Sequence, residues 1–285
     1  MNKRDTKRMI TAKLIEQYAV YLQEQEKSPA TIEKYIRDLT ALCEYLSGAG
    51  VTKTDLLLWK ENLMERYAAS SVNTILAAVN GLLDFCGWGD LKVKPLKIQR
   101  NLFCREDQEL TKAEYLRLVH AAHDAGNERL ALILQTICAT GIRVSELQYI
   151  TIESVQTGRA VVHCKGKTRA VFLPGKLKQA LRCYIRKQKR TTGSVFVTRT
   201  GKTIDRSNIW RDMKNLCESA GVTPGKVFPH NLRHLFARTY YSLEKDLSRL
   251  ADILGHTSVS TTRIYTIESG AVHRGQMERM GLVIT

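Results

Sequence analysis

Apolar residues recur at intervals of three and four through most of the first hundred positions, the spacing that places them on one face of an α-helix. Four such runs follow one another. Their apolar positions are Leu14, Tyr18, Tyr21 and Leu22; Ile32, Ile36, Leu39, Cys43 and Leu46; Leu56, Leu63, Met64 and Tyr67; and Val72, Ile75, Leu76, Val79, Leu82 and Leu83. The second run follows Ser28-Pro29, a helix cap and a proline suited to the first turn. The pattern predicts a small all-helical domain.

The helical periodicity lapses between residues 87 and 108. Residues 90–97 are basic and interrupted by Pro95, which is typical of an extended connection. We therefore predict a helical domain over residues 1–92, a linker over 93–108 and a second domain over 109–285.

The second domain combines helical runs with one short β-rich pair. Thr111 and Glu114 form a capping box that opens a helix to about residue 122, and residues 127–140 are a strongly apolar helix. Two β-rich runs, 159–164 and 169–173, flank a Lys-Gly-Lys-Thr turn and predict a hairpin. Further helices are predicted at 175–190, 206–219, 230–242, 246–254 and about 260–267. The predicted fold class is mainly α with a small β-sheet (α+β).

Composition places this chain among folded proteins of about two domains. It has 285 residues, 44% hydrophobic and 25% charged. No run approaches the roughly 20 apolar residues of a transmembrane helix, and the charged start lacks the apolar core of a signal peptide. We expect no membrane association and a cytoplasmic, nucleoid-associated protein. The seven cysteines are odd in number and at least 18 residues apart, which argues against disulfides and a zinc site.

The charge is strongly basic and unevenly distributed. The net charge is +16, with 15 basic and 12 acidic residues in 1–100 but 29 and 16 in 101–285. Residues 154–204 contain 13 Lys or Arg and no Asp or Glu. A solvated helix face normally mixes both signs, so this acid-free stretch predicts a surface that faces phosphates. Nucleic acid is the expected partner.

Four short motifs stand out in the second domain. They are Ala139-Thr140-Gly141-Ile142-Arg143-Val144-Ser145-Glu146-Leu147; Lys165-Gly166-Lys167; Pro229-His230-Asn231-Leu232-Arg233-His234; and Leu254-Gly255-His256 with Tyr265 nine residues later. Together they resemble the tyrosine recombinase, or phage integrase, family, in the order Arg, Lys, His-x-x-Arg, Gly-His, Tyr. The first domain, with Ser28-Pro29-Ala30-Thr31, resembles the core-binding domain of that family. The resemblance implies a two-domain clamp on DNA.

The residue types suit phosphodiester chemistry. Attack on a phosphodiester concentrates negative charge on the non-bridging oxygens, and the guanidinium groups of Arg143 and Arg233 can meet it with a planar fork of donors. His230 lies three residues before Arg233, on the same helical face. The resemblance assigns catalytic roles to these three residues, to His256 and to Tyr265, which is expected to be the nucleophile.

Departure of the 5′ oxygen requires a proton, which a lysine beside other cations can supply. The resemblance favours Lys165 as this general acid, with Lys167 as the alternative because the hairpin is shorter than the commoner form. Glu146 is expected to support the site by holding a guanidinium or a histidine in position. Contacts to DNA are expected from the basic hairpin and the segment after it. These residues are Lys167, Arg169, Lys176 and Lys178.

A metal site at His230 and His234 is the competing interpretation. The zinc-protease pattern requires Glu directly after the first histidine, where Asn231 stands, and no carboxylate or thiol cluster offers a third ligand. We therefore expect neither metal nor cofactor, and a structural role for His234.

The expected function is site-specific recombination: cutting and rejoining duplex DNA through a 3′-phosphotyrosine, without metal or ATP. The alternatives are a topoisomerase of the same chemistry and a non-catalytic DNA-binding protein. Family resemblance implies a homotetramer on paired sites, and it allows accessory DNA-bending or directionality proteins. The apolar tail after Tyr265 packs either on a neighbouring subunit or on its own domain. About ten residues precede the first helix, so we expect no separate arm-binding domain, as in a Xer-like recombinase or a compact mobile-element integrase.

Overall fold

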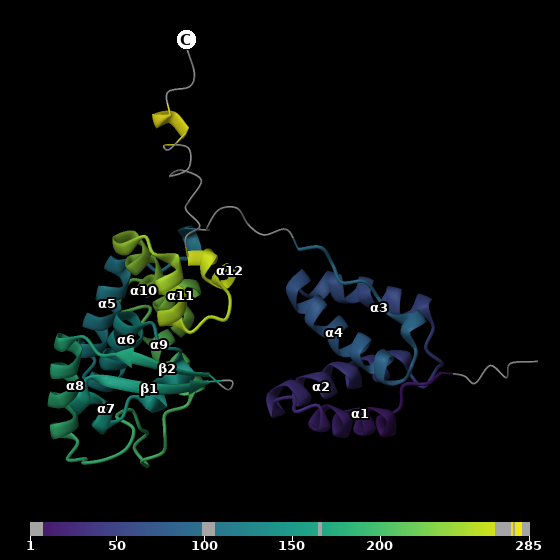
Figure 1. The fold of residues 1–285 in the computed structure, drawn as a ribbon, viewed down its shortest axis with the longest axis horizontal. Helices are drawn as coiled ribbons and strands as arrows, with labels where there is room; N and C mark the ends of the chain where they lie inside the picture. Colours follow the sequence, from purple (N-terminus) through teal and green to yellow (C-terminus); the bar gives the residue numbers. More distant parts are fainter. Residues whose placement is uncertain (1–7, 99–105, 165–166, 266–274, 276, 281–285) are drawn as a thin grey trace, which may run out of the picture. The chain divides into compact units, whose positions relative to one another are not determined.

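The computed structural model of this chain describes residues 8–98, 106–164, 167–265, 275 and 277–280. The chain divides into two compact units, Met1–Arg100 and Asn101–Thr285 (Figure 1). Both are built mainly of helices, and the described part contains one two-stranded antiparallel sheet. The predicted class, mainly α with a small β-sheet, is confirmed.

Unit 1 is a four-helix domain closed by a short 3-10 turn. Its elements are α1 (Ala12–Glu24), α2 (Pro29–Leu46), α3 (Lys53–Arg66), α4 (Ala69–Phe85) and η1 (Gly89–Leu91). Ser28 accepts the N–H of Thr31 and so caps α2, with Pro29 in its first turn. Leu39 and Leu42 of α2 are fully buried against apolar residues of the other helices. The predicted helices thus form because each has one apolar face to bury.

Helix α3 is rotated relative to the sequence prediction. Leu56, Trp59 and Leu63 are its buried residues, whereas the side chain of Met64 is 49% exposed and that of Tyr67 is 52% exposed. Leu56, Trp59 and Leu63 keep one helical face, and the residue after Leu63 points away from it. Tyr67 has extended backbone and ends the helix.

The segment after η1, the first part of the predicted 93–108 linker, packs on unit 1. The side-chain amide of Asn80 donates to the carbonyl of Val93 (2.8 Å) and accepts its N–H (2.9 Å). Asn73, seven residues earlier on α4, makes the same pair of contacts with Leu96, at 2.9 and 2.7 Å. Lys60 of α3 donates to the Lys94 carbonyl. Asparagine amides thus satisfy backbone groups that a linker would leave to water.

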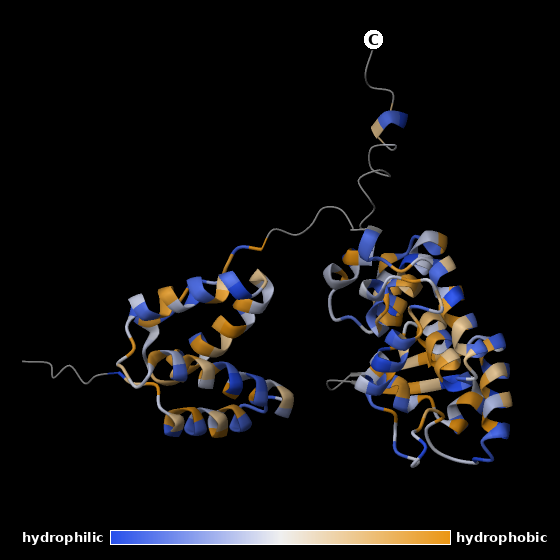
Figure 2. Ribbon diagram, turned by 180° about the vertical axis from the view of Figure 1, so that it is seen from behind, coloured by the Kyte–Doolittle hydropathy of each residue, from blue (hydrophilic) through white to orange (hydrophobic). Residues whose placement is uncertain are grey.

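Unit 2 packs its helical core against one face of the two-stranded sheet: Val162 and Val171 are buried, whereas Val161 and Phe172 on the other face are exposed. Its elements are η2 (Glu106–Gln108), α5 (Lys112–Asp124), α6 (Glu128–Thr140), η3 (Val144–Tyr149), α7 (Ile152–Thr157), β1 (Arg159–Cys164), β2 (Lys167–Phe172), α8 (Gly175–Lys187), α9 (Arg206–Asn215), η4 (Pro224–Lys226), α10 (Pro229–Glu244), α11 (Leu247–Leu254), α12 (Val259–Thr262) and η5 (Arg263–Tyr265). Figure 2 shows hydrophobic stretches on the inner elements of this unit and polar stretches on its outer ones. Helix α6 lies in the core, with Ile133, Leu134 and Ile137 fully buried.

The hairpin forms as predicted, except that the second strand spans Lys167–Phe172 and not 169–173. In it Val162 pairs with Arg169 and Cys164 with Lys167, so β2 begins at Lys167, two residues before the predicted start. The 3-10 turns η1, η2 and η4 have no counterpart among the sequence predictions, nor do the longer elements η3 and α7. Both are only six residues long, too short for a helical period to be recognised.

Candidate active site

Arg233 is the centre of the candidate site. It lies in the second turn of α10, which Pro229 opens, and its residue surface is only 2% exposed. Its guanidinium donates to the carbonyls of Gly141 (2.5 Å) and Leu254 (2.7 Å), and Nη2 lies 3.0 Å from Nε2 of His256. A buried cation therefore joins the C-terminal ends of α6 and α11 to α10.

Both of those helix ends require glycine. Gly141 ends α6 with φ +65°, and Gly255 ends α11 with φ +66°, the left-handed region that favours glycine. A Cβ on Gly141 would lie 2.4 Å from Cδ1 of Phe236. The chain can therefore turn sharply at both points, and Arg143 and His256 follow directly after the two turns.

His256 faces Arg233 with one ring nitrogen and Thr262 with the other. A guanidinium only donates, so Nε2 accepts from Arg233 and the ring proton lies on Nδ1, 2.8 Å from the hydroxyl of the fully buried Thr262. Burial, followed by the charges of Arg233 and Arg143, lowers the pKa of His256 to about 4. The imidazole is therefore neutral at physiological pH.

Tyr265 lies against the same group of side chains. It ends η5, is 4% exposed, and stacks on His256 with ring centroids 6.0 Å apart and planes at 17°. Burial lowers the pKa of Arg233 to about 10, with Arg143 adding to the effect, while hydrogen bonding with Tyr265 acts in the opposite direction. Arg233 stays charged at neutral pH, with the tyrosine hydroxyl beside it.

His230 and His234 occupy the start of α10. Their rings meet edge to face at 4.6 Å, and the ring of His234 meets that of Tyr265 at 4.7 Å and 82°. His230 is exposed at the surface, yet the atoms packed around its ring, and then the charges of His234 and Arg233, lower its pKa. His234 thus contacts the predicted nucleophile directly.

Glu109 was not identified from the sequence and lies behind His234. One carboxylate oxygen is 3.5 Å from Nδ1 of His234, and the other accepts from Arg238 at 3.2 Å. The hydrogen bond with His234 is the main cause that lowers the pKa of Glu109, against its burial. No motif marks this residue, because its partners are about 125 residues away in the chain.

Glu146 holds two arginines at once. Arg143 caps η3, and Glu146 accepts both its backbone N–H (2.8 Å) and its Nη1 (3.0 Å). The guanidinium of Arg169, from β2, binds the same carboxylate through Nη1 (2.9 Å) and Nη2 (2.8 Å). The side chain of Glu146 is 2% exposed, whereas that of Arg143 is 35% exposed. Arg143 therefore keeps a surface that an anion can reach.

Arg169, expected from the sequence to contact DNA, is largely buried. Its side chain is 13% exposed, and Nε donates to the carbonyl of Ile253 at 3.2 Å in addition to the two bonds with Glu146. The guanidinium is thus turned into the protein. Successive side chains of a strand point to opposite faces, and Arg169 lies on the buried face, opposite Val162. The sequence alone did not determine this register.

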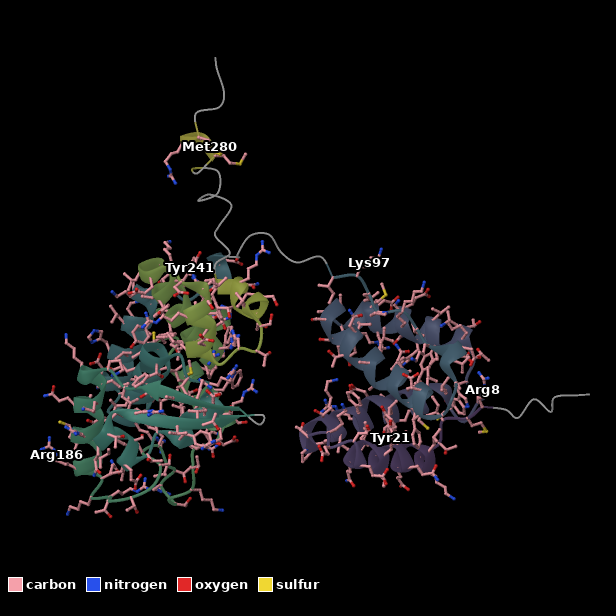
Figure 3. The ribbon with its side chains drawn as sticks, in the orientation of Figure 1. Arg8, Tyr21, Lys97, Arg186, Tyr241 and Met280 are labelled. Atoms are coloured by element: carbon pink, nitrogen blue, oxygen red, sulfur yellow. The ribbon has the colours of Figure 1, made fainter. Side chains whose placement is uncertain are left out.

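The other predicted basic residues lie elsewhere or outside the described side chains. Lys165 and Gly166 are not among the described residues, and nothing is described of the Lys167 side chain. Lys176 is exposed and Lys178 half-buried; Lys178 lines an open groove of about 770 Å³ between α7 and α8 with Arg182 and Arg186. Figure 3 places Arg186 on the outer side of α8. Among the described residues, those that line this groove do not include Arg143, His230, Arg233, His256 or Tyr265.

The lowered pKa of Glu146 makes the free energy of unfolding depend on pH. Burial alone would raise its pKa, but the hydrogen bonds from Arg169 and Arg143 prevail and lower it from 4.5 to about 2. A lowered pKa stabilises the folded state above the unfolded value, and this contribution is lost as pH falls from about 4.5 towards 2. The shift corresponds to about 3 kcal/mol.

The test compares urea unfolding of wild type and Glu146→Gln between pH 7 and pH 3. Wild type is expected to be more stable by about 3 kcal/mol at pH 7, with the difference shrinking as the pH falls below 4.5. A difference that is constant with pH would mean that the carboxylate charge is not what the two arginines require.

Across residues 8–98, 106–164, 167–265 and 277–280, no group of three or more His, Cys, Asp or Glu is placed to hold a metal ion. In the same part of the chain, no helix combines the length and apolar character needed to cross a bilayer.

A buried arginine, a second arginine held by a carboxylate, three histidines and a tyrosine hydroxyl thus meet at one place in unit 2. Guanidinium groups beside a hydroxyl are the donors that an anionic substrate requires. Residues 108–270 match the phage integrase family and residues 15–88 match the phage integrase N-terminal SAM-like domain. The chain belongs to the phage integrase family.

Named relatives cover nearly the full chain. The tyrosine recombinase XerC of Roseiflexus castenholzii is 32% identical over 269 residues, 85% of this chain and 84% of the relative. The tyrosine recombinase XerA of Pyrococcus furiosus is 28% identical over 285 residues, 96% of each chain. The expectation of a tyrosine recombinase is confirmed.

Solved structures share the fold. A crystal structure of XerA recombinase is 26% identical, covers 96% of this chain and 99% of its own, and has a TM-score of 0.53. Lambda integrase (75–356), as a dimer bound to a COC′ core site, is 17% identical with a TM-score of 0.75, covering 91% and 96%. XerH bound to its difH substrate is 19% identical with a TM-score of 0.70, covering 90% and 82%.

Proposed function

We propose that this chain is a site-specific DNA recombinase in which Tyr265 attacks the scissile phosphate of a duplex. The observation that carries the proposal is the meeting of the Tyr265 hydroxyl, the buried guanidinium of Arg233 and the neutral ring of His256. An anion drawn to Arg233 would lie next to the hydroxyl. Proximity of this kind converts a bimolecular attack into an effectively intramolecular step.

The proposed reaction is a pair of transesterifications that need no cofactor. The Tyr265 Oη–P bond forms as the P–O5′ bond breaks. The phenolic proton passes to the neutral imidazole of His256, and the leaving oxygen takes a proton from Lys165 or Lys167, giving a 3′-phosphotyrosine and a free 5′-hydroxyl; the second step returns both protons. The 5′-hydroxyl of a second strand then attacks the phosphotyrosine and restores the tyrosine. The phosphoester bond is exchanged rather than hydrolysed, so no ATP or metal is needed.

The cations stabilise the transition state. Arg233 and Arg143 offer donors to the non-bridging oxygens, where negative charge increases during attack. His230, exposed at the start of α10, is available to the same phosphate. In the free protein, Nε2 of His256 accepts a hydrogen bond from Nη2 of Arg233. When a phosphate oxygen accepts from Nη2 instead, Nε2 loses this partner. Once protonated, Nε2 can donate to the substrate.

DNA binding is expected to be strongly salt-dependent. The second unit carries most of the net charge of +16, and neutralising about 6–10 phosphates lowers affinity by about 10³–10⁵ between 50 and 200 mM salt. Fluorescence anisotropy with a labelled duplex over this range gives the slope. Affinity that does not change with salt would contradict binding through backbone phosphates.

Plasmid substrates test the type of reaction. A site-specific recombinase is expected to join covalently only to plasmids that carry its recognition sequence, which sequencing of trapped DNA from a random library identifies. Relaxation of supercoiled plasmids that lack any such sequence would instead indicate a topoisomerase. Salt-sensitive binding with no covalent product on any DNA would indicate a non-catalytic binding protein.

The active assembly is proposed to be a homotetramer on two paired sites. Solved relatives include a lambda integrase dimer on a core site and a tetramer on a Holliday junction. Accessory DNA-bending or directionality proteins remain part of this proposal. The tail after Tyr265, which lies mostly outside the described residues, is proposed to pack on a neighbouring subunit or on its own unit.

A further inference from the structure

We propose that Arg169 is a positioning residue that fixes Arg143 and His256 relative to the β-hairpin, and that it does not contact DNA. This inference rests on the proposed recombinase function. The Arg169 side chain makes three contacts: with Glu146, with the carbonyl of Ile253 and with Gly255. Each contact leads to a different part of the site.

The first link runs through Glu146 to Arg143. Two parallel N–H bonds of 2.9 and 2.8 Å join Arg169 to the carboxylate, which is the geometry that orients both partners. The same two oxygens accept the Nη1 and the backbone N–H of Arg143. Without Arg169, the carboxylate could rotate about its side chain and carry the Arg143 guanidinium with it.

The second link runs to the end of α11. Nε of Arg169 donates to the carbonyl of Ile253, and Arg233 donates to the next carbonyl, that of Leu254. The last carbonyls of a helix have no partner within it. Two arginines therefore fill adjacent positions at the helix end that leads to His256.

The third link is a close approach to Gly255. A Cβ on this residue would lie 2.8 Å from Cδ and 3.1 Å from Nη1 of Arg169. The left-handed turn before His256 therefore rests on the Arg169 side chain, so the position of that side chain and the direction of the histidine depend on one another.

The backbone of Arg169 connects these links to the hairpin. Arg169 pairs with Val162 in the sheet, two residues beyond the pair of Lys167 with Cys164. The strand that leads from the lysine candidates is thereby joined to both the Arg143 side and the His256 side. A residue that only stabilised the fold would not need all three connections.

The test compares Arg169→Met and Arg169→Lys with wild type. Methionine removes every donor, whereas lysine keeps the charge but not the paired geometry. Residues that orient a reacting group typically contribute 10- to 100-fold. We expect the single-turnover cleavage rate at saturating protein to fall by about that factor in both variants, with the dissociation constant for DNA little changed.

Arg117→Met is the matched control. Arg117 also donates to two backbone carbonyls, those of Ala220 and Gly221, which lie after α9 and outside the group of side chains around Arg233. It should lower thermal stability without changing the cleavage rate of the folded protein. Gly255→Ala is a second probe, since it displaces the Arg169 side chain and leaves its charge intact; it should slow cleavage as Arg169→Lys does.

An NMR titration of His256 supplies a readout that does not depend on activity. Arg169 is one of the charges that lower the pKa of His256, so the titration midpoint should rise in Arg169→Met and stay unchanged in Arg117→Met. If wild type forms no covalent product, the recombinase proposal fails, and this shift still reports on the placement of Arg169.

Two results would overturn the inference. One is a folded Arg169→Lys variant that cleaves at the wild-type rate. The other is a loss of DNA affinity in Arg169→Met that accounts for the whole loss of cleavage, since it would mean that the guanidinium contacts a phosphate directly.

Discussion

Replacing Tyr265 with phenylalanine is expected to abolish the covalent joint between protein and DNA and to lower strand cleavage by at least about 10⁴-fold, the scale seen when a nucleophile is removed. The substitution deletes one oxygen and keeps the ring. The packing of that ring on His256 and against His234 should persist, so the fold and DNA binding are expected to survive.

The measurement is cleavage of a labelled duplex followed by denaturing electrophoresis, in which the adduct migrates more slowly. Tyr241→Phe is the matched control, because Tyr241 packs on the same apolar cluster as Tyr265, while the cation over its ring is Lys245. Undiminished adduct from Tyr265→Phe would assign the nucleophile to another residue.

Arg233→Lys is expected to have the second-largest effect, a fall of about 10²–10³-fold in cleavage rate. An ammonium keeps the charge but cannot reach the Gly141 carbonyl, the Leu254 carbonyl and the His256 ring in the planar arrangement that the guanidinium provides. Because a buried acceptor left without its donor costs about 1–3 kcal/mol, a loss of stability should accompany the loss of rate.

Separating these two effects requires thermal unfolding and single-turnover cleavage on the same preparation, below the melting temperature of the variant. Asn231→Ala, also buried on α10 but bonded to the carbonyls of Gln108 and Lys226, serves as a stability control. If Asn231→Ala and Arg233→Lys lose cleavage in equal proportion to their loss of stability, Arg233 has only a structural role.

The sequence predicts secondary structure well where one apolar pattern repeats along the chain. The four helices of unit 1 and the hairpin follow from apolar periodicity, because each must bury one face. It failed at α3, where Met64 and Tyr67 are exposed and Trp59 is buried. In the predicted linker, Asn73 and Asn80 bind the backbone at Leu96 and Val93, and Val93 is buried, a packing that the basic, proline-interrupted pattern did not indicate.

For the site, the order of the motifs indicated which residue types meet, but not how they contact one another. The inward direction of Arg169 depends on a strand register, and the contact between Glu109 and His234 joins residues far apart in the chain. Neither leaves a local pattern. The hydrogen bond of His256 with Thr262 is likewise visible only once α12 folds back on the end of α11.

The central claim is that Tyr265 becomes joined to DNA. The most direct measurement is to trap the adduct on a duplex carrying a 5′-bridging phosphorothiolate, whose leaving thiol cannot reverse the step, and to sequence the DNA-linked peptide by mass spectrometry. The account predicts a single modified peptide with the nucleotide on Tyr265. Attachment at any other residue, or no attachment on DNA that the protein binds and recombines, would contradict it.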